Sequence, residues 1–290
     1  MIGTRAKRRV CFAAAAALAG ACCAGCDGTT PDFMTEDRMR NGLVIILPGI
    51  EGESPMNHNI RHGLLSAGVN RAMPIHRWGS PIPIASLLVN QVNFIGNRLA
   101  GAKVAKMIVA YQDTHPGKPV HVIGHSGGGG VAVFAAEAMP EGRKVDGLIL
   151  LSASISNGYD LTKALGKCTS GVLNFFSKAD VGLLMVGTTI VGNVDGMHGP
   201  SAGLTGFTTP GSGAPSAKRQ AYSNLYQVQF TSDMTGGGDA HSGSTNPAFV
   251  RRYVTSWVTS ASWPAGSVAS GRPDNSAAPT GGELSAAGRK

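Results

Sequence analysis

Runs of aliphatic residues recur along the middle of the chain and are separated by stretches of helical spacing. The first run, Leu43–Leu47, stops at Pro48-Gly49, a pattern typical of a strand that is buried on both faces. Similar patterns predict further strands at residues 72–78, 119–124, 145–152, 172–176 and 225–230. The chain therefore has about six predicted strands.

Amphipathic segments fill the intervals between these runs. Residues 84–111 carry apolar side chains three or four positions apart, and His115-Pro116-Gly117 follows them, which predicts one long helix ended by a turn. Shorter helices are predicted at residues 57–67, 127–139, 160–165 and 247–259. Residues 181–220 are rich in Gly, Thr and Ser and are predicted to be irregular. Because strands and helices alternate, we expect an α/β fold with a mostly parallel sheet and helices on both faces.

The two ends of the chain differ in composition from this middle part. Basic residues at positions 5, 7, 8 and 9 precede 16 uncharged, mostly small residues, fewer than the roughly 20 that span a bilayer. Residues 1–25 are therefore predicted to be an export signal, with a retained membrane anchor as the alternative. A linker (26–41), one α/β domain (42–262) and a disordered tail rich in Gly, Ser, Ala and Pro (263–290) complete the predicted organisation.

A cysteine motif lies at the end of the predicted signal. Cys23-Ala24-Gly25-Cys26 resembles the lipobox of bacterial lipoproteins, in which small residues precede the cysteine that is lipidated, although that motif usually has Leu where this chain has Cys23. The resemblance implies lipidation at Cys26 and a cell-envelope protein with a lipid anchor. Residues 18–22 offer a second, poorer register, and ordinary cleavage with secretion is the alternative.

Charge and cysteine content argue against several kinds of partner and site. The 25 Lys and Arg residues outnumber the 17 Asp and Glu by 8, but removal of the four basic residues of the signal leaves 21 against 17, a net charge of +4. Much of the basicity thus belongs to the signal, and a nucleic-acid partner is not expected. Only Cys168 lies in the body of the chain, without a neighbouring motif, so neither a disulfide nor a zinc site is indicated.

One motif carries a specific chemistry. Gly124-His125-Ser126-Gly127-Gly128 follows a predicted strand and precedes a predicted helix. Ligands of parallel sheets bind at the carboxyl ends of the strands, and a tight turn there would expose the Ser126 hydroxyl as a nucleophile. A phosphate-binding loop would need Lys and Ser or Thr after the glycines, where this chain has Val131-Ala132.

With this motif in its strand–turn–helix context, residues 42–260 resemble the α/β-hydrolase superfamily. In that family the acid follows a later strand and the histidine follows the last one. The resemblance implies that Asp180, after the predicted strand 172–176, is the acid; Asp195 and Asp160 are the alternatives.

The base is assigned in the same way. His241 follows the last predicted strand and precedes the last predicted helix, so the resemblance implies that it is the catalytic base. His198 is the alternative, and His125 is expected to point away from the nucleophile because of the geometry of the turn.

The loop after the first strand completes the predicted site. Leu47-Pro48-Gly49-Ile50 resembles the His-Gly-x loop of the family, with Pro48 where His is common. The resemblance implies an oxyanion hole formed by the backbone N–H groups of Ile50 and Gly127. Glu51, next in the chain, is predicted to bind a substrate cation or to hold the loop, unless it is only a solvated carboxylate.

Together these residues imply a serine hydrolase, similar to carboxylesterases and lipases, that cleaves an acyl ester or thioester through an acyl-enzyme, with no metal or organic cofactor. The expected partner is a small-molecule or lipid-like acyl substrate. Predicted elements fill the interval between Ser126 and Val172, so we expect little or no cap over the site. An acyltransferase with the same triad and a non-catalytic binding lipoprotein on this scaffold are the alternatives. The acyl group and the oligomeric state leave no recognisable mark in the sequence.

Overall fold

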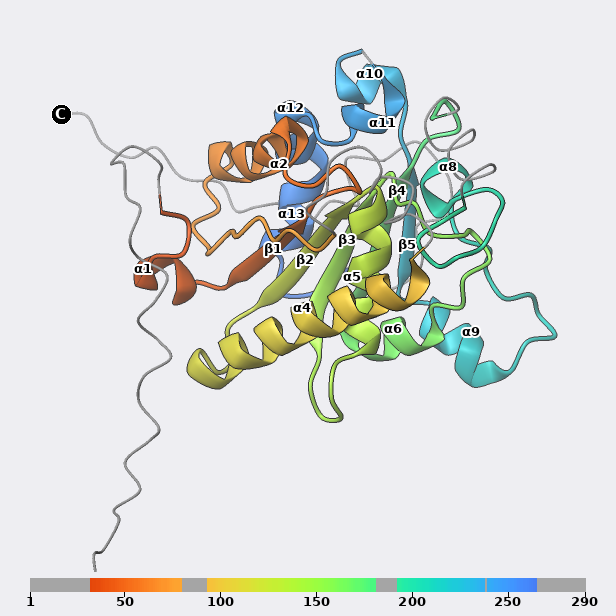
Figure 1. The fold of residues 1–290 in the computed structure, drawn as a ribbon, viewed down its shortest axis with the longest axis horizontal. Coiled ribbons are helices and arrows are strands. Elements are labelled where there is room, and N and C mark those ends of the chain that lie inside the picture. The colour runs from red at the N-terminus through yellow and green to blue at the C-terminus, as the bar shows by residue number, and fades with distance from the viewer. Residues whose placement is uncertain (1–31, 80–92, 181–191, 238, 265–290) are drawn as a thin grey trace, which may run out of the picture. The chain divides into compact units, whose positions relative to one another are not determined.

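Five parallel strands form the centre of the fold (Figure 1). The computed structural model describes residues 32–79, 93–180, 192–237 and 239–264. The strands are adjacent in chain order: β1 (Leu43–Leu47), β2 (Val120–His125), β3 (Val145–Leu151), β4 (Cys168–Phe176) and β5 (Leu225–Gln229). Every neighbouring pair is parallel, so each connection crosses over one face of the sheet. The predicted α/β class with a parallel sheet is confirmed.

The sixth predicted strand, at residues 72–78, is present only as a bridged edge. Isolated parallel bridges join Leu43 to Ala72 and Ile46 to Ile75, and the Ile46 N–H donates to the Pro74 carbonyl at 2.9 Å. Pro74 has no N–H to donate, so a continuous ladder cannot form along this segment. The segment therefore lies beside β1 without becoming a regular strand.

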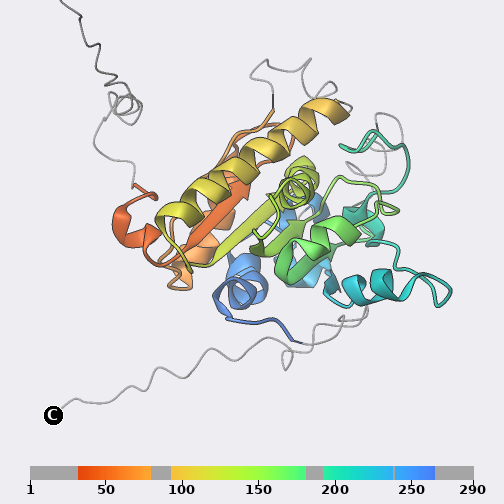
Figure 2. The same cartoon turned by 90° about the horizontal axis from the view of Figure 1, so that it is seen from below.

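Helices cover both faces of the sheet, as Figure 2 shows from below. One face carries α4 (Phe94–Thr114), α5 (Gly127–Glu137), α6 (Thr162–Gly166) and α9 (Ser216–Tyr222). The other face carries α2 (Pro55–Ser66), α12 (Pro247–Phe249), the π-helical turn η2 (Val250–Val254) and α13 (Thr255–Thr259). Each face has its own apolar core, so β1 is buried along its whole length as its pattern predicted.

Four short helices complete the described part: α1 (Glu36–Met39), α8 (Ala202–Thr205), α10 (Ser232–Thr235) and α11 (Ala240–Gly243). The predicted irregular region contains α8 and α9, and the predicted last helix is divided by η2. Of the long helix predicted at residues 84–111, the part before residue 93 lies outside the described residues, as do the predicted signal and nearly all of the tail.

Residues just outside the predicted domain (42–262) also pack against it, at both ends. The Arg61 guanidinium lies 3.8 Å from the centre of the Phe33 ring, and the buried Trp263 donates from Nε1 to the Trp257 carbonyl at 2.8 Å. Among the helices that the structure describes, none is long and apolar enough to cross a bilayer.

Candidate active site

Ser126 occupies a strained turn between the end of β2 and the start of α5. Its φ of 51° and ψ of −123° are a conformation that residues with a side chain rarely adopt. The main chain is held from both sides by the segment after β3: the Ser126 N–H donates to Leu151 O at 3.0 Å, and its carbonyl accepts from the Ser154 N–H at 2.9 Å. The turn is therefore fixed by the neighbouring strand rather than by its own sequence alone.

The glycines on either side of Ser126 are required by close contacts. A Cβ added at Gly124 would overlap the Gly128 carbonyl, and one added at Gly128 would overlap the carbonyl oxygens of Leu47 and Pro48. Both positions need glycine because backbone, which cannot move aside, lies where the side chain would be. The spacing of the motif thus reflects how tightly α5 packs against the ends of β1 and β2.

Asp180 and His241 lie in contact at the same end of the sheet. Asp180 follows β4 and His241 lies in α11, and both side chains are buried. The distance from His241 Nδ1 to Asp180 Oδ2 is 2.9 Å. Nδ1–H donates a hydrogen bond to the carboxylate, and this tautomer leaves Nε2 with a lone pair that can accept a proton.

Ser126 is connected to this pair through the preceding residue. The ring of His125 lies 4.9 Å from the ring of His241, centre to centre. No hydrogen bond joins the Ser126 hydroxyl to His241 within the described part of the chain. Serine–histidine contacts in hydrolases are often loose without substrate and tighten in the complex. The structure therefore brings Asp180 and His241 into direct contact and Ser126 into their neighbourhood.

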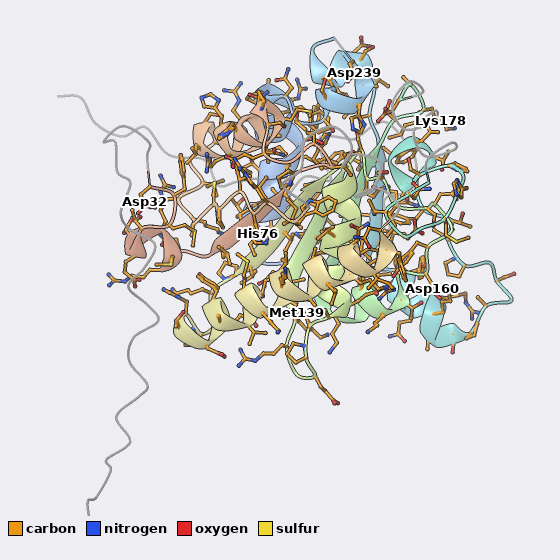
Figure 3. The ribbon with its side chains drawn as sticks, viewed as in Figure 1. Asp32, His76, Met139, Asp160, Lys178 and Asp239 are labelled. Carbon is orange, nitrogen blue, oxygen red and sulfur yellow. The ribbon has the colours of Figure 1, made fainter. Side chains whose placement is uncertain are left out.

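The alternative acids and base have other surroundings. Asp195 accepts hydrogen bonds from the Ser156 main-chain N–H, at 3.2 Å, and from the Ser156 hydroxyl. Asp160 lies beside α6, well below Asp239, the residue that precedes α11 (Figure 3). A hydrogen bond from Lys218 lowers the pKa of Asp160 to about 2. His198 is exposed, and among the described residues the hydrogen bond to Asp180 comes from His241 instead.

The loop after β1 abuts the serine turn. A Cβ added at Gly127 would lie 2.8 Å from Ile50 Cγ2, so the two residues predicted to form the oxyanion hole are neighbours. Trp78 donates from Nε1 to the Pro48 carbonyl at 2.6 Å and holds the loop in place. Neither the Ile50 nor the Gly127 N–H donates a hydrogen bond to a residue in the described ranges.

Glu51 reaches back over the same loop. A Cβ at Gly49 would overlap its carboxylate, and the Ser54 hydroxyl donates to Oε1 at 3.4 Å. Burial raises the pKa of Glu51, while backbone hydrogen bonds and the charge of His241 act in the opposite direction. The carboxylate of Glu51 is thus close enough to His241 for an electrostatic interaction, and the sequence left its role open.

His125 is the residue that the sequence missed. It was expected only to point away from the nucleophile, yet its Nε2 lies 3.2 Å from the main-chain carbonyl of His241. Burial, and secondly the charge of His241, lower the pKa of His125 to about 3. Its place at the carboxyl end of a buried strand signals a neutral, enclosed ring, but no sequence pattern identifies its partner.

The described residues support neither a reactive cysteine nor a metal site. Cys168 is buried at the start of β4, and burial raises the pKa of its thiol to about 12, so it is not a reactive thiolate. Within the described ranges, no three His, Cys, Asp or Glu side chains gather closely enough to hold a metal ion.

Comparison with known proteins shows a distant likeness in structure. No protein-family model matches the sequence, and no curated protein matches it either. Similar solved structures include lipase B of Aspergillus fumigatus (15% identity, TM-score 0.46), covering 83% of this chain and 55% of the lipase. Esterase PE8 (14%, TM-score 0.44) covers 73% of this chain and 92% of its own. A dienelactone hydrolase-like promiscuous phosphotriesterase, P91, from metagenomic libraries (15%, TM-score 0.42) covers 65% and 69%.

These likenesses do not decide the reaction. The chain spans 55% of the length of the Aspergillus lipase, and all three TM-scores are 0.46 or lower. The arrangement of the described elements is that expected of the α/β-hydrolase fold.

Proposed function

We propose that this protein is a serine hydrolase that cleaves an acyl ester or thioester with Ser126 as nucleophile, His241 as base and Asp180 as acid. The observation that carries the proposal is the 2.9 Å contact between His241 Nδ1 and Asp180 Oδ2. This contact is buried and lies at the carboxyl end of the sheet, where the strained turn presents Ser126. Two residues 61 positions apart in the chain meet close to Ser126, whose strained backbone is the conformation that a nucleophile elbow requires.

The reaction follows from these positions. His241 Nε2 takes the proton of the Ser126 hydroxyl while Oγ bonds to the acyl carbon, and the carbonyl oxygen becomes an oxyanion stabilised by the N–H groups of Gly127 and Ile50. The alcohol or thiol leaves with the proton from His241, and an acyl-serine remains. Water then repeats the attack, His241 again carries the proton, and the acid and free Ser126 are released. Asp180 holds the tautomer of His241 and stabilises the imidazolium.

Apolar side chains beside the turn support an acyl substrate. Ile50 and Trp78 are half-buried and both lie within about van der Waals distance of the position where Gly127 would carry a Cβ. They give the loop side of the site an apolar wall that can receive a hydrocarbon group. A series of p-nitrophenyl esters with increasing acyl length measures how much hydrocarbon this wall accommodates.

A fluorophosphonate probe tests the proposal, because it reacts only with an activated serine. Mass spectrometry should place the label on Ser126, and Ser126→Ala should remove it. His241→Ala should also abolish labelling with the fold intact, whereas the matched variant His198→Ala should label at the wild-type rate. Labelling that persists in Ser126→Ala rules out this nucleophile, and loss in His198→Ala but not in His241→Ala reassigns the base.

The acid has its own test. Asp180→Asn should lower kcat by on the order of 10³- to 10⁴-fold, because the imidazole then loses the partner that selects its tautomer. Asp195→Asn serves as the control, since Asp195 bonds to Ser156 instead of to His241. An unaffected kcat in Asp180→Asn would remove this residue from the triad.

We also propose that the protein is exported and lipidated at Cys26. The proposal is supported by the sequence alone: basic residues, an uncharged stretch and small residues directly before the cysteine. Mass spectrometry of the detergent-extracted protein should find a diacylglyceryl group on Cys26, and Cys26→Ser should move the protein out of the membrane fraction. A plain N-terminus in the mature protein contradicts the proposal.

A further inference from the structure

Three buried polar side chains gather beneath the backbone of His241. His125 Nε2 lies 3.2 Å from the His241 carbonyl oxygen, and the Ser244 hydroxyl donates to the same oxygen at 3.5 Å. The Ser152 hydroxyl in turn lies 3.2 Å from that of Ser244. These residues come from the end of β2, the end of α11 and the segment after β3. Two side chains from separate parts of the fold, His125 and Ser244, thus contact a buried main-chain carbonyl, and Ser152 contacts the second of them.

The chemistry of this contact defines the state of His125. A carbonyl oxygen only accepts hydrogen bonds, so Nε2 must carry the proton and donate it. Nδ1 is then bare; it is buried and meets no partner within the described residues. The charged groups that act on the ring are His241 and Asp239, and its pKa is lowered to about 3, mainly by burial. His125 therefore remains a neutral donor throughout the neutral pH range.

We propose that His125, assisted by Ser244, is a positioning residue that sets the place of the His241 imidazole relative to the nucleophile. His125 directly precedes Ser126 in the chain, so a single link of 3.2 Å ties the backbone of the base to the residue beside the nucleophile. Asp180 fixes the ring of His241 from its Nδ1 side, and His125 fixes its backbone. This inference rests on the proposed function, since it assigns a role within the same triad.

A second histidine on the same strand provides a matched control. His121 lies four residues before His125, on the same face of β2, and is buried to a similar extent (2% and 0% exposed). Burial lowers the pKa of His121 to about 3 as well. Its contacts are Arg71, 3.3 Å from Nδ1, and the ring of Trp263, at the other end of the strand. Variants at the two positions share the loss of a buried ring, but only those at His125 remove the link to His241.

The test compares two amide side chains of different length at position 125. His125→Gln keeps an amide N–H at about the distance of Nε2, whereas the Asn side chain of His125→Asn is one methylene shorter and cannot reach the carbonyl. The substrate is p-nitrophenyl butyrate, and the number of active sites is determined by titration with a fluorophosphonate. In His125→Asn we expect kcat to fall roughly ten-fold or more, while KM stays within about two-fold of the wild-type value. His125→Gln should recover most of kcat, and His121→Asn should keep the wild-type kcat per labelled site. The proton NMR signal of the Nδ1 hydrogen shared by His241 and Asp180 should move in His125→Asn and stay in His121→Asn.

Several results would overturn the proposal. These are a wild-type kcat in His125→Asn, an equal loss in the Gln and Asn variants, or an equal loss in His121→Asn. If His125→Asn does not fold, Ser244→Ala removes the second donor to the same carbonyl, and an unchanged kcat in that variant is decisive against the role. A wild-type protein that carries no label on Ser126 instead refutes the proposed function, so the two failures are distinguishable.

Discussion

Two serines adopt a backbone conformation that is unfavourable for any residue with a side chain. Ser126 (φ 51°) and Ser152 (φ 49°) are the non-glycine residues with positive φ in the described part of the chain. They end adjacent strands, β2 and β3, and Ser126 donates its N–H to Leu151, the residue before Ser152. Strain of this kind persists only where the surrounding fold enforces it, and here it is confined to the edge where the proposed chemistry takes place.

The charge of Glu51 is expected to influence His241 at the carboxyl edge of the sheet. Its carboxylate interacts with His241, and its pKa is raised by burial. An ionised Glu51 stabilises the positive charge that develops on His241 in the transition state. Glu51→Gln should therefore reduce kcat/KM at neutral pH by on the order of three- to ten-fold, and the difference from wild type should shrink at acid pH, where the wild-type Glu51 is itself protonated. A pH–rate profile measures both effects.

The control for this experiment lies two residues further on. Glu53 is also a carboxylate of the same loop, but it pairs with Arg77 at 3.0 Å and with His58 at 3.1 Å. Glu53→Gln removes the same charge from the protein without removing it from His241, so its profile should match that of wild type. Identical profiles for Glu51→Gln and wild type would mean that Glu51 does not act on the base.

At the scale of elements, the glycine run that opens α5 is explained by packing. Glycine destabilises a helix interior by about 1 kcal/mol relative to alanine, so a run from Gly127 to Gly130 is unfavourable by itself. Each of these residues, however, lies against a neighbour: Gly129 faces Ala153, and Gly130 faces Val194 and Ile155. The helix can approach the strand ends because it has no side chains on this turn, and the approach is what places Ser126.

Alanine variants test this account. Gly128→Ala should lower the free energy of unfolding by on the order of 3 kcal/mol or more, because its Cβ would overlap main-chain carbonyls that cannot retreat. Gly166, in α6, has open space around its Cβ position. Gly166→Ala should be neutral or stabilising by up to about 1 kcal/mol. Urea denaturation measures both, and equal stability of the two variants would contradict the packing argument.

The elements also show which features a sequence pattern can predict. Buried strands such as β1 and β3 were predicted because, in a protein of this size, an apolar run bounded by turn residues seldom forms anything other than a buried strand. The start of β4 was missed: the strand begins at Cys168, where Thr169, Ser170 and Gly171 interrupt the apolar run. Pairing with β3 makes this stretch a strand, and pairing is not encoded locally.

The candidate site also combines features that the sequence predicts with features that it does not. The contact between Asp180 and His241 could be predicted because the order of strands along the chain restricts which loops meet at one edge. The link from His125 to the carbonyl of His241 could not, because it depends on the distance between two loops in the folded protein rather than on residue type. Contacts of side chains with main-chain atoms leave no pattern in the sequence.

For the whole molecule, the two buried histidines of β2 couple folding to pH. His121 and His125 have pKa values of about 3 when folded and close to 6.5 when unfolded. As the pH falls below 6.5, the unfolded chain binds protons that the folded protein does not, so the free energy of unfolding decreases. Between pH 7 and pH 5 each histidine should remove about 2 kcal/mol, and above pH 7 neither should contribute.

Denaturant titrations of wild type and His121→Asn at pH 5, 6 and 7 test this coupling. His121→Asn lowers stability at pH 7 because it removes a buried ring, but its stability should decline less steeply toward pH 5, by about 2 kcal/mol over the interval. The comparison isolates the histidine, since carboxyl groups that titrate in this range are present in both proteins. Parallel pH dependences in the two proteins would show that His121 takes up its proton while the protein is still folded.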